Sequence, residues 1–335
     1  MLRKRFNIGL LVNAVLTAIP FSVFSAPSTS PYPIPPELAS LPVIQAEPWA
    51  QVTTAKQVLL EGPAFDRQGN LFVVSGWEGK IYKITPNKEV TTIFNKPSVR
   101  VNGGAIHKDG RLFGSCLTGE LIAMKTDGSD LTYIETRYQG KPTAMNDLTF
   151  DSKGNLYTTE YTGSVVKPTG GVYRFSSDFK TCEPVIVGLE TANGLKFSPD
   201  EKLLWVTASY QLIEVSMSPK GSAHYFEKPF GSGARVRCTF TGGNVDGLAL
   251  DVKGNIYVAI NEQGRVVITN RIGIPIALVL MPGRDENEHN WTSSVAFKPG
   301  TDEVYVTASS ATGTTGAWIY KFRGLAEGLK LFSHQ

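Results

Sequence analysis

The stretch VDGLALDVKGNIYVAI, residues 245–260, contains the unit from which this chain is built. Apolar and polar residues alternate on both sides of a Lys-Gly-Asn turn. This alternation predicts two short antiparallel strands joined by a tight hairpin. Asp246 is the second residue of the unit, at the start of the first strand, and other copies of the unit also have a polar residue near this place.

Five further copies of the unit occur along the chain, and such internal repeats decide a fold before any other signal. The copies are GPAFDRQGNLFVVS (62–75), GGAIHKDGRLFGSC (103–116), NDLTFDSKGNLYTTE (146–160), NGLKFSPDEKLLWVTA (193–208) and SSVAFKPGTDEVYVTA (293–308). Further strands follow them, such as GKIYKITP at 79–86 and GGVYRFSS at 170–177. Six units with a rhythm of four short strands predict an all-β fold, a six-bladed β-propeller, rather than a sandwich or jelly roll.

The first 25 residues have the pattern of a signal peptide. Three cations at positions 3–5 precede an apolar run at 8–23, and Ser25 supplies a small residue before a cleavage point at Ala26. The run is shorter than the roughly 20 residues that a membrane span needs, and Asn13 interrupts it. We therefore expect cleavage, a periplasmic or secreted protein, and no association with a membrane afterwards.

The rest of the chain divides into two parts. Residues 26–50 are rich in proline and serine and predict an extended N-terminal arm over one face of the ring. Residues 51–335 are expected to form a single propeller, the catalytic domain. The last copy of the unit offers about three strands, so the segment VTTAKQVLLEG (52–62) is expected to supply the missing strand.

Charge and cysteine content exclude several classes of function. The formal net charge is +3, and residues 1–25 contain three cations and no acid, which leaves the mature chain near neutrality. No basic run with interleaved aromatic residues is present, so nucleic acid is not expected as a partner. Cys116, Cys182 and Cys238 lie far apart, without CxxC or Cys/His spacing, and are expected to be ordinary strand residues.

Polar residues recur near the start of the first strand in each unit. In a propeller this strand lines the central channel, so these side chains are expected to converge at one mouth of it. They are Glu61, Asn102, Asn146, Asn193, Asp246 and the 292–294 stretch. Polar groups buried there are costly unless they are paired or bind an ion. Carboxylate and amide oxygens suit calcium, whereas the His and Cys ligands typical of zinc are absent from these positions. The alternative is that each Asn only caps a turn.

Several stretches together resemble one known family. They are EGPAFD (61–66), NDLTFD (146–151), ANGLKFSPDEKLLWVT (192–207), VDGLALDVKGNIYVA (245–259) and MPGRDE (281–286). In this order they resemble the gluconolactonase and senescence-marker-protein (regucalcin) family, most of all its drug-responsive, calcium-dependent lactonase branch. The resemblance implies a six-bladed propeller with one catalytic calcium ion, which hydrolyses a cyclic ester, a small-molecule lactone.

The resemblance also implies roles for individual residues. Glu61, Asn146, Asn193 and Asp246 match the metal ligands, and Asp246 would also be the catalytic general acid and base. Zn²⁺, Mn²⁺ or Mg²⁺ would be substitutes for Ca²⁺. Relatives of this branch can bind a second, structural calcium in a loop before the third blade. Here that loop reads ETRYQGKPTAMND (135–147), in which Tyr138 and Lys141 stand where acidic or hydroxyl ligands are wanted, and this argues against a second ion.

Four residues are candidates for substrate binding. Arg100 and Asn102 resemble the Arg-x-Asn pair that gluconolactonases use for sugar hydroxyls, although one blade early. Asp147 adjoins Asn146, and His289 lies in the loop GRDENEHNW (283–291), which could cover the channel mouth. Two other functions remain open. One is a different metal-dependent esterase or phosphotriesterase on the same scaffold, and the other is a propeller that binds a ligand without catalysis.

Overall fold

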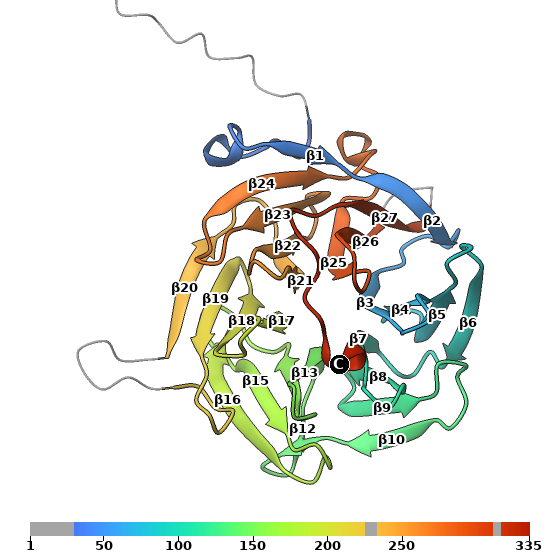
Figure 1. Ribbon diagram of the computed structural model, residues 1–335, viewed down its shortest axis with the longest axis vertical. Coiled ribbons are helices and arrows are strands. Elements are labelled where there is room, and N and C mark those ends of the chain that lie inside the picture. The colour runs from blue at the N-terminus through green and yellow to red at the C-terminus, as the bar shows by residue number, and fades with distance from the viewer. Residues whose placement is uncertain (1–29, 225–232, 311–315) are drawn as a thin grey trace, which may run out of the picture.

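Six four-stranded antiparallel sheets surround a central channel in the computed structural model, which confirms the six-bladed β-propeller (Figure 1). The structure describes residues 30–224, 233–310 and 316–335, so the expected signal peptide at 1–25 lies outside the described part. Within the described part, no helix is long and apolar enough to cross a membrane.

The first three blades follow each other along the chain. Blades 1 and 2 consist of β3 (Leu60–Phe65), β4 (Leu71–Ser75), β5 (Lys80–Ile84), β6 (Val90–Asn95), β7 (Val101–Ile106), β8 (Leu112–Cys116), β9 (Glu120–Met124) and β10 (Thr132–Glu135). A small hairpin of β11 (Arg137–Tyr138) and β12 (Lys141–Pro142) precedes blade 3. Blade 3 consists of β13 (Met145–Phe150), β14 (Leu156–Glu160), β15 (Gly170–Phe175) and β16 (Cys182–Leu189).

Blades 4 to 6 complete the ring. Blades 4 and 5 consist of β17 (Ala192–Phe197), β18 (Leu203–Ala208), β19 (Gln211–Ser216), β20 (Ala234–Thr239), β21 (Val245–Leu250), β22 (Ile256–Ile260), β23 (Arg265–Thr269) and β24 (Pro275–Leu280). Blade 6 consists of β25 (Trp291–Phe297), β26 (Glu303–Ser309), β27 (Ala317–Arg323) and β2 (Glu47–Thr53). The described residues also form the short 3₁₀ helices η1 (Pro36–Leu38), η2 (Arg284–Glu286) and η3 (Phe332–His334).

The hairpins that the repeat predicts form for a local chemical reason. In blade 5, Asp251 Oδ1 accepts hydrogen bonds from the backbone N–H groups of Lys253 and Asn255, both at 2.9 Å, and its Oδ2 accepts one from the Asn255 amide at 2.8 Å. Gly254 between them has a φ of 80°, which glycine adopts without steric cost. The same pattern recurs at Asp66 and Asp151, so the Asp-x-x-Gly-Asn sequence itself builds the turn.

Hydrophobic clusters between neighbouring blades form the core. One cluster joins Tyr305 and Ile319 of blade 6 to Leu71 and Tyr82 of blade 1, and the other clusters lie between successive blades in the same way. Each blade therefore buries its faces against two neighbours, and burial of this kind contributes roughly 25 cal/mol per Å² of apolar surface. Closing the ring gives every blade both neighbours.

The segment that closes the ring lies further toward the N-terminus than predicted. The strand that pairs with β27 is β2, Glu47–Thr53, rather than the segment that begins at Val52. Part of the proline-rich segment is also built into the ring, because β1 (Val43–Gln45) adds a parallel fifth strand to β24 at the outer edge of blade 5 (Figure 1). The expected extended arm is thus partly a strand: residues 43–45 alternate between exposed and half-buried side chains and pair with the outermost strand of blade 5.

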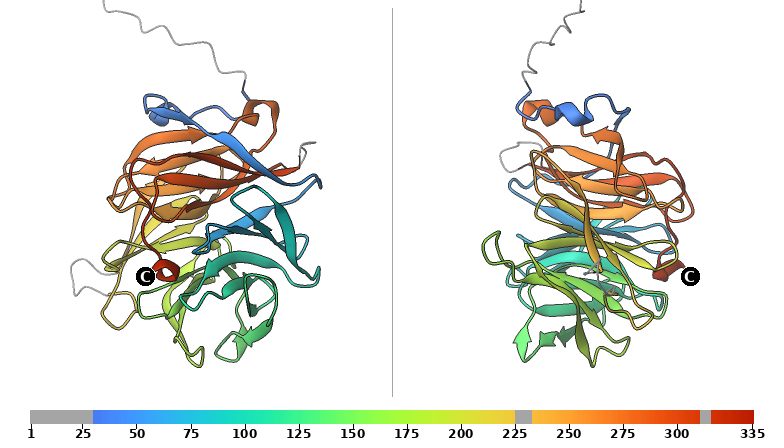
Figure 2. Two further views of the ribbon diagram at one scale, coloured as in Figure 1. Left: turned by 45° about the vertical axis from the view of Figure 1, so that its right-hand side comes forward. Right: turned by 90° about the vertical axis from the view of Figure 1, so that its left-hand side faces the viewer.

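The C-terminal segment, residues 327–335, closes one mouth of the channel, at which the innermost strands end (Figure 2). We call it the strap and this mouth the lower mouth; the innermost strands begin at the upper mouth. The strap is held at blade 5 by the Leu329 N–H, which donates to Leu250 O at 3.0 Å. Across the mouth, the Phe332 ring lies 5.0 Å from that of His107 in blade 2. The strap half-buries His107.

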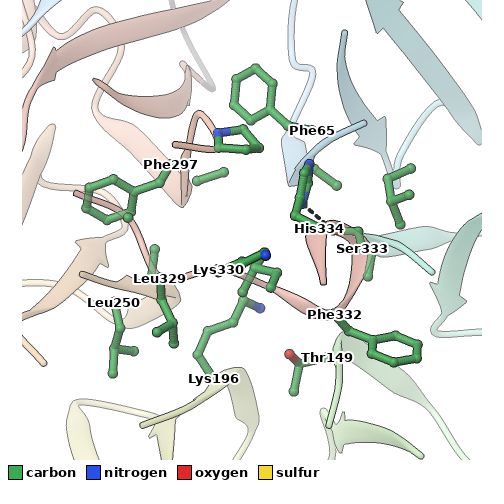
Figure 3. Close-up of a pocket in the computed structure, with 18 of the residues that line it drawn as sticks. Phe65, Thr149, Lys196, Leu250, Phe297, Leu329, Lys330, Phe332, Ser333 and His334 are labelled. Atoms are coloured by element: carbon green, nitrogen blue, oxygen red, sulfur yellow. Dashed lines mark hydrogen bonds between the residues drawn. The ribbon is translucent and has the colours of Figure 1, made fainter. Parts of the chain in front are cut away.

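A chamber of about 560 Å³ lies between the strap and the channel walls (Figure 3). The residue before the last one in each innermost strand lines it, and five of these six are small: Ala64, Ala105, Thr149, Ala249 and Ala296. The sixth is Lys196, which points into the chamber (Figure 3). Small residues at this level leave the channel hollow below the upper mouth.

Candidate functional site

The candidate ligand residues coincide with an irregularity in strand pairing. In blade 5 the register between β21 and β22 shifts between Val245 and Leu248, which places Asp246 and Gly247 in a bulge. All six innermost strands show such a shift at the equivalent place. A β-bulge bends the strand and redirects a side chain. In blades 2 to 5 the shift contains the candidate residue Asn102, Asn146, Asn193 or Asp246, whereas in blade 1 it directly follows Glu61.

The four predicted metal ligands are all buried at this mouth. Glu61 is 5% exposed, Asn146 4%, Asn193 8% and Asp246 3%. Each comes from a different innermost strand, β3, β13, β17 or β21. Glycines next to the bulges allow the strands to approach one another: a Cβ on Gly194 would lie 2.7 Å from Asp246 O. The close packing of β17 against β21 therefore places Asn193 beside Asp246, and the Glu61 carboxylate is near enough to Asp246 for their charges to interact.

Hydroxyl groups of the second strands fix the backbone of these residues. Thr159 of β14 accepts a hydrogen bond from the Asp147 N–H at 3.0 Å and donates to Asn193 O in the next blade. Thr207 of β18 accepts one from the Gly194 N–H at 2.7 Å and donates to Asp246 O, also at 2.7 Å. Each hydroxyl satisfies an N–H that the bulge leaves without a strand partner. Each also ties one ligand-bearing strand to the next.

Ser115 and Ser293 complete this arrangement. Ser115 Oγ donates to Asn146 O, and Ser293 Oγ donates to Leu60 O, next to Glu61. The four hydroxyl groups form what we call the hydroxyl relay: Ser115, Thr159, Thr207 and Ser293. The backbone at or beside every predicted ligand is therefore held by a hydroxyl from the preceding blade.

The carboxylate of Asp246 has one satisfied and one unsatisfied oxygen. Its Oδ2 accepts a hydrogen bond from the Asn261 amide at 2.9 Å, whereas its Oδ1 is buried without a hydrogen-bond partner among the described residues. Burial raises the pKa of Asp246 to about 7, against the hydrogen bond from Asn261 and the neighbouring amide of Asn193, which lower it. A buried carboxylate oxygen without a donor is costly unless a cation or a proton meets it.

Glu61 faces the same electrostatic problem. Burial raises its pKa well above the ordinary value, and the nearby carboxylates of Asp246 and Asp147 raise it further. Among the described residues, no three side chains of the His, Cys, Asp and Glu types gather around one point. A cation here would therefore use two carboxylates together with the amide oxygens of Asn146 and Asn193, and the donor set fits a hard ion such as calcium.

The other candidates lie at different levels of the channel. Asn102 is half-buried in the bulge of β7, and its Oδ1 also lacks a hydrogen-bond partner among the described residues. Arg100 is exposed ahead of the same strand. Asp147 is buried, and its Oδ2 lies 3.2 Å from Lys196 Nζ. This ion pair lies between the upper mouth and the chamber, which both residues line.

His289 does not join the other candidates. It is 6% exposed, and its Nδ1 lies 2.7 Å from the hydroxyl of Tyr320 on β27, two strands outward from the channel. His289 thus packs against the aromatic side chains of blade 6, and its role in substrate binding stays a prediction. Arg284 in the same loop is also buried, where it donates to Gln263 O at 3.1 Å.

Two residues near the predicted ligands were not predicted from the sequence. Asn261 follows β22 and holds Asp246, and Tyr161 follows β14 near Asp246 and Glu61, whose charges contribute to a raised pKa of its phenol after burial. Both stand directly after a second strand, at the end that pairs with the bulge. The repeat could have shown this position, since the C-terminal end of each second strand meets the start of the first.

The loop before blade 3 contains no acidic cluster at the proposed second site. Residues 137–142 form the β11–β12 hairpin, in which Tyr138 pairs with Lys141. The Tyr138 ring lies 5.1 Å from that of Tyr173 on β15. The hairpin thus packs an aromatic side chain against blade 3.

Comparison with known proteins connects this geometry to a family. The profile of the SMP-30/Gluconolactonase/LRE-like region matches residues 59–310. Lactonase drp35 of Staphylococcus saprophyticus is 38% identical over 320 residues, which cover 92% of this chain and 96% of the relative. Lactonase drp35 of Staphylococcus aureus is 37% identical over 330 residues, which cover 95% and 98%.

Solved structures share the fold at lower identity. A calcium-binding protein, regucalcin, from Agrobacterium tumefaciens superposes with a TM-score of 0.69 at 19% identity, covering 86% of this chain and 98% of that chain. A gluconolactonase from Xanthomonas campestris gives a TM-score of 0.66 at 19% identity, covering 82% and 94%. The profile match over most of the chain and the relatives above one third identity agree, and the chain belongs to the SMP-30/gluconolactonase/LRE-like family.

Proposed function

We propose that this protein is a calcium-dependent lactonase, which hydrolyses a cyclic ester at the upper mouth of its propeller. The observation that supports this most directly is the buried Oδ1 of Asp246, which has no hydrogen-bond partner among the described residues, together with three further buried oxygen-bearing side chains from other blades. Relatives named lactonases that cover nearly the whole chain support the reaction class. The name of the regucalcin neighbour, a calcium-binding protein, supports the choice of ion.

The residues would divide the work as follows. Glu61, Asn146, Asn193 and Asp246 would hold the calcium ion, which supplies Lewis-acid polarisation of the lactone carbonyl when bound. Asp246 would accept the proton of the attacking water at Oδ1, since this oxygen has two lone pairs and faces the site. It would return the proton to the departing ring oxygen, which balances the hydrolysis.

The protein's own structure prepares this step before any substrate arrives. The hydroxyl relay holds the backbone of the ligand residues, so little reorganisation is needed on binding. The upper mouth is the route for the substrate, because the strap covers the lower mouth. A bound cation would lower the pKa of Asp246 and make it a weaker base. The ion would therefore contribute more to the rate than proton transfer.

Metal analysis combined with activity tests this proposal. Purified protein would be analysed for calcium, and hydrolysis of dihydrocoumarin followed before and after treatment with EGTA. We expect about one calcium per chain, with activity lost to the chelator and restored by CaCl₂. Asp246→Asn should abolish turnover, whereas Asp178→Asn in an exposed outer hairpin should leave it unchanged.

Other outcomes would change the assignment. Turnover of aryl esters or organophosphates in preference to lactones would favour a different hydrolase on this scaffold. Protein that neither binds a divalent ion nor turns over any of these substrates would favour a ligand-binding propeller. Full activity in EGTA would contradict the role of calcium.

A further inference from the structure

We propose that Asn261 is the positioning residue of the calcium site: its amide holds Oδ2 of Asp246 and thereby turns Oδ1 toward the ion. This inference rests on the calcium site of the proposed function and concerns a residue that is not itself a ligand. It explains why one oxygen of a buried carboxylate is satisfied and the other is not.

The position of Asn261 follows from strand pairing in blade 5. Ile260, the last residue of β22, pairs with Val245 at the start of β21. Asn261 comes next and its backbone N–H donates to Asn244 O at 2.9 Å. Asn261 is therefore anchored beside the bulge that contains Asp246, at the upper mouth.

The amide of Asn261 has only one orientation that satisfies both of its ends. Its Nδ2 donates to Asp246 Oδ2 at 2.9 Å, and its Oδ1 accepts from the Glu262 N–H at 2.8 Å. Glu262 has a φ of 64°, in the left-handed region, and the turn there directs its N–H back onto Asn261. Rotating the amide by 180° would set oxygen against oxygen and N–H against N–H, so the turn determines which group faces Asp246.

A consequence for Asp246 follows. Without this hydrogen bond, rotation about the Cβ–Cγ bond of Asp246 would allow either carboxylate oxygen to face the site. Held at Oδ2, it presents Oδ1, which is buried and has no partner among the described residues. Thr207 fixes the backbone of the same residue at its carbonyl oxygen. Asp246 is thus held at the main chain and at one side-chain oxygen, which leaves one oxygen for the ion.

The same contacts use both ends of the Asn261 amide within the protein. Its side-chain oxygen accepts the Glu262 N–H, so it is the nitrogen that faces Asp246. Its nitrogen donates to Asp246 and is an amide donor, not a metal ligand. Residues that hold metal ligands in this way commonly change metal affinity by about 10- to 100-fold when they are removed.

Calcium titration of the full chain tests the inference. Metal-stripped wild type, Asn261→Ala and Asn261→Leu would be titrated with CaCl₂ by isothermal calorimetry. The leucine variant keeps most of the side-chain volume but has no donor. We expect calcium affinity to fall by about 10-fold or more in both variants, while the melting temperature in EGTA changes little. Asn261→Gln, which retains an amide, should recover part of the affinity.

Gln263→Ala is the matched control. It removes another amide from the same loop, which donates to Gly242 O at 2.8 Å and does not contact Asp246. This variant should bind calcium like the wild type. If it loses affinity as much as Asn261→Ala, the loop acts only through its general structure and the inference is overturned.

The remaining outcomes separate this inference from the proposed function. Wild-type affinity in both Asn261→Ala and Asn261→Leu, with calcium bound by the wild type, would overturn the positioning role alone. A wild type that binds no calcium would overturn the proposed function and the inference together. If Asn261→Ala does not fold, Asn261→Leu and Asn261→Gln decide the question.

Discussion

The hydroxyl of Thr207 in blade 4 donates a hydrogen bond of 2.7 Å to the backbone carbonyl of Asp246 in blade 5. It also accepts the N–H of Gly194 in its own blade, so one side chain joins two ligand-bearing strands. We predict that Thr207→Val destabilises the protein by about 1–3 kcal/mol, because it leaves a buried carbonyl and a buried N–H without partners. Urea unfolding in the presence and absence of CaCl₂ would measure this.

The same variant should also weaken calcium binding, since Asp246 loses its backbone anchor. Thr91→Val on β6 is the control, because that threonine is exposed at the outer edge of blade 1. Equal effects of the two substitutions on stability would show that the hydroxyl relay has no special role.

Replacing Glu61 by Gln should have opposite effects on the metal-free and the calcium-bound protein. Burial and two nearby carboxylates disfavour the charge of Glu61, so removing this charge should raise the melting temperature in EGTA at neutral pH. The same change removes a charged ligand, and the gain in melting temperature on adding CaCl₂ should shrink. Differential scanning fluorimetry with and without CaCl₂ would separate the two effects. A variant with lower stability in EGTA than the wild type would contradict this account.

The metal-free protein should lose stability as the pH rises. In the folded state the pKa of Asp246 is raised from 3.8 to about 7, and in the unfolded chain it returns to its ordinary value. At pH values between these two pKa values the folded protein binds more protons than the unfolded chain, so the free energy of unfolding decreases with increasing pH. Melting temperatures measured in EGTA over this pH range should show the decline, and Asp246→Asn should make it shallower. An unchanged slope in the variant would argue against the raised pKa.

Gly194 should not tolerate a side chain. A Cβ there would lie 2.7 Å from Asp246 O and 2.9 Å from Gly247 Cα, both of which belong to the backbone. We expect Gly194→Ala to destabilise the protein by more than about 3 kcal/mol, because overpacking in a well-ordered core displaces the strands. Thermal unfolding would measure the change, and calcium affinity should fall with it.

Gly188 offers a comparison at an unconstrained position. It has a φ of 82°, but no atom lies within 4 Å of the position that a Cβ would take. Gly188→Ala should therefore cost only the roughly 1–2 kcal/mol of a left-handed backbone. A larger loss at Gly188 than at Gly194 would show that close approach of the strands does not limit the site.

The strap should matter for stability and not for the chemistry. Phe332→Ala removes ring contacts with His107 and Phe150 at the lower mouth, and we expect a loss of about 2 kcal/mol, less than for a fully buried Phe. Lactone turnover at low temperature should remain unchanged, because the site lies at the opposite mouth. Leu331→Ala, at an exposed neighbour, should change neither property. A large loss of turnover in Phe332→Ala would show coupling between the two mouths.

The sequence predicted the fold because each unit encodes its own hairpin. The Asp251, Gly254 and Asn255 pattern builds the turn locally in blade 5, as its equivalents do in blades 1 and 3. The six copies of the whole unit indicate the number of blades. The position of the closing strand was missed, because pairing between β2 and β27 joins segments far apart in the sequence and no local pattern shows it.

The repeat also indicates the candidate ligands, but not the residue that holds Asp246. Asp246 and its three companions recur at one position of the unit, so their convergence could be derived from repetition alone. The role of Asn261 could not, since it depends on a turn in which Glu262 adopts a left-handed conformation. The contact of His289 with Tyr320 could not be derived either, because the side chains onto which a loop packs are distant in the sequence.

The pairing of β2 with β27 also has a consequence for biosynthesis. Residues 47–53 emerge from the ribosome early, yet the strand with which they pair is residues 317–323. Until that partner is made, β2 is an open edge, which chaperones and proteases recognise. A product interrupted before residue 317 could not close the ring, so its blades 6 and 1 would lack a shared core. Closure of the ring therefore depends on synthesis of the chain as far as β27.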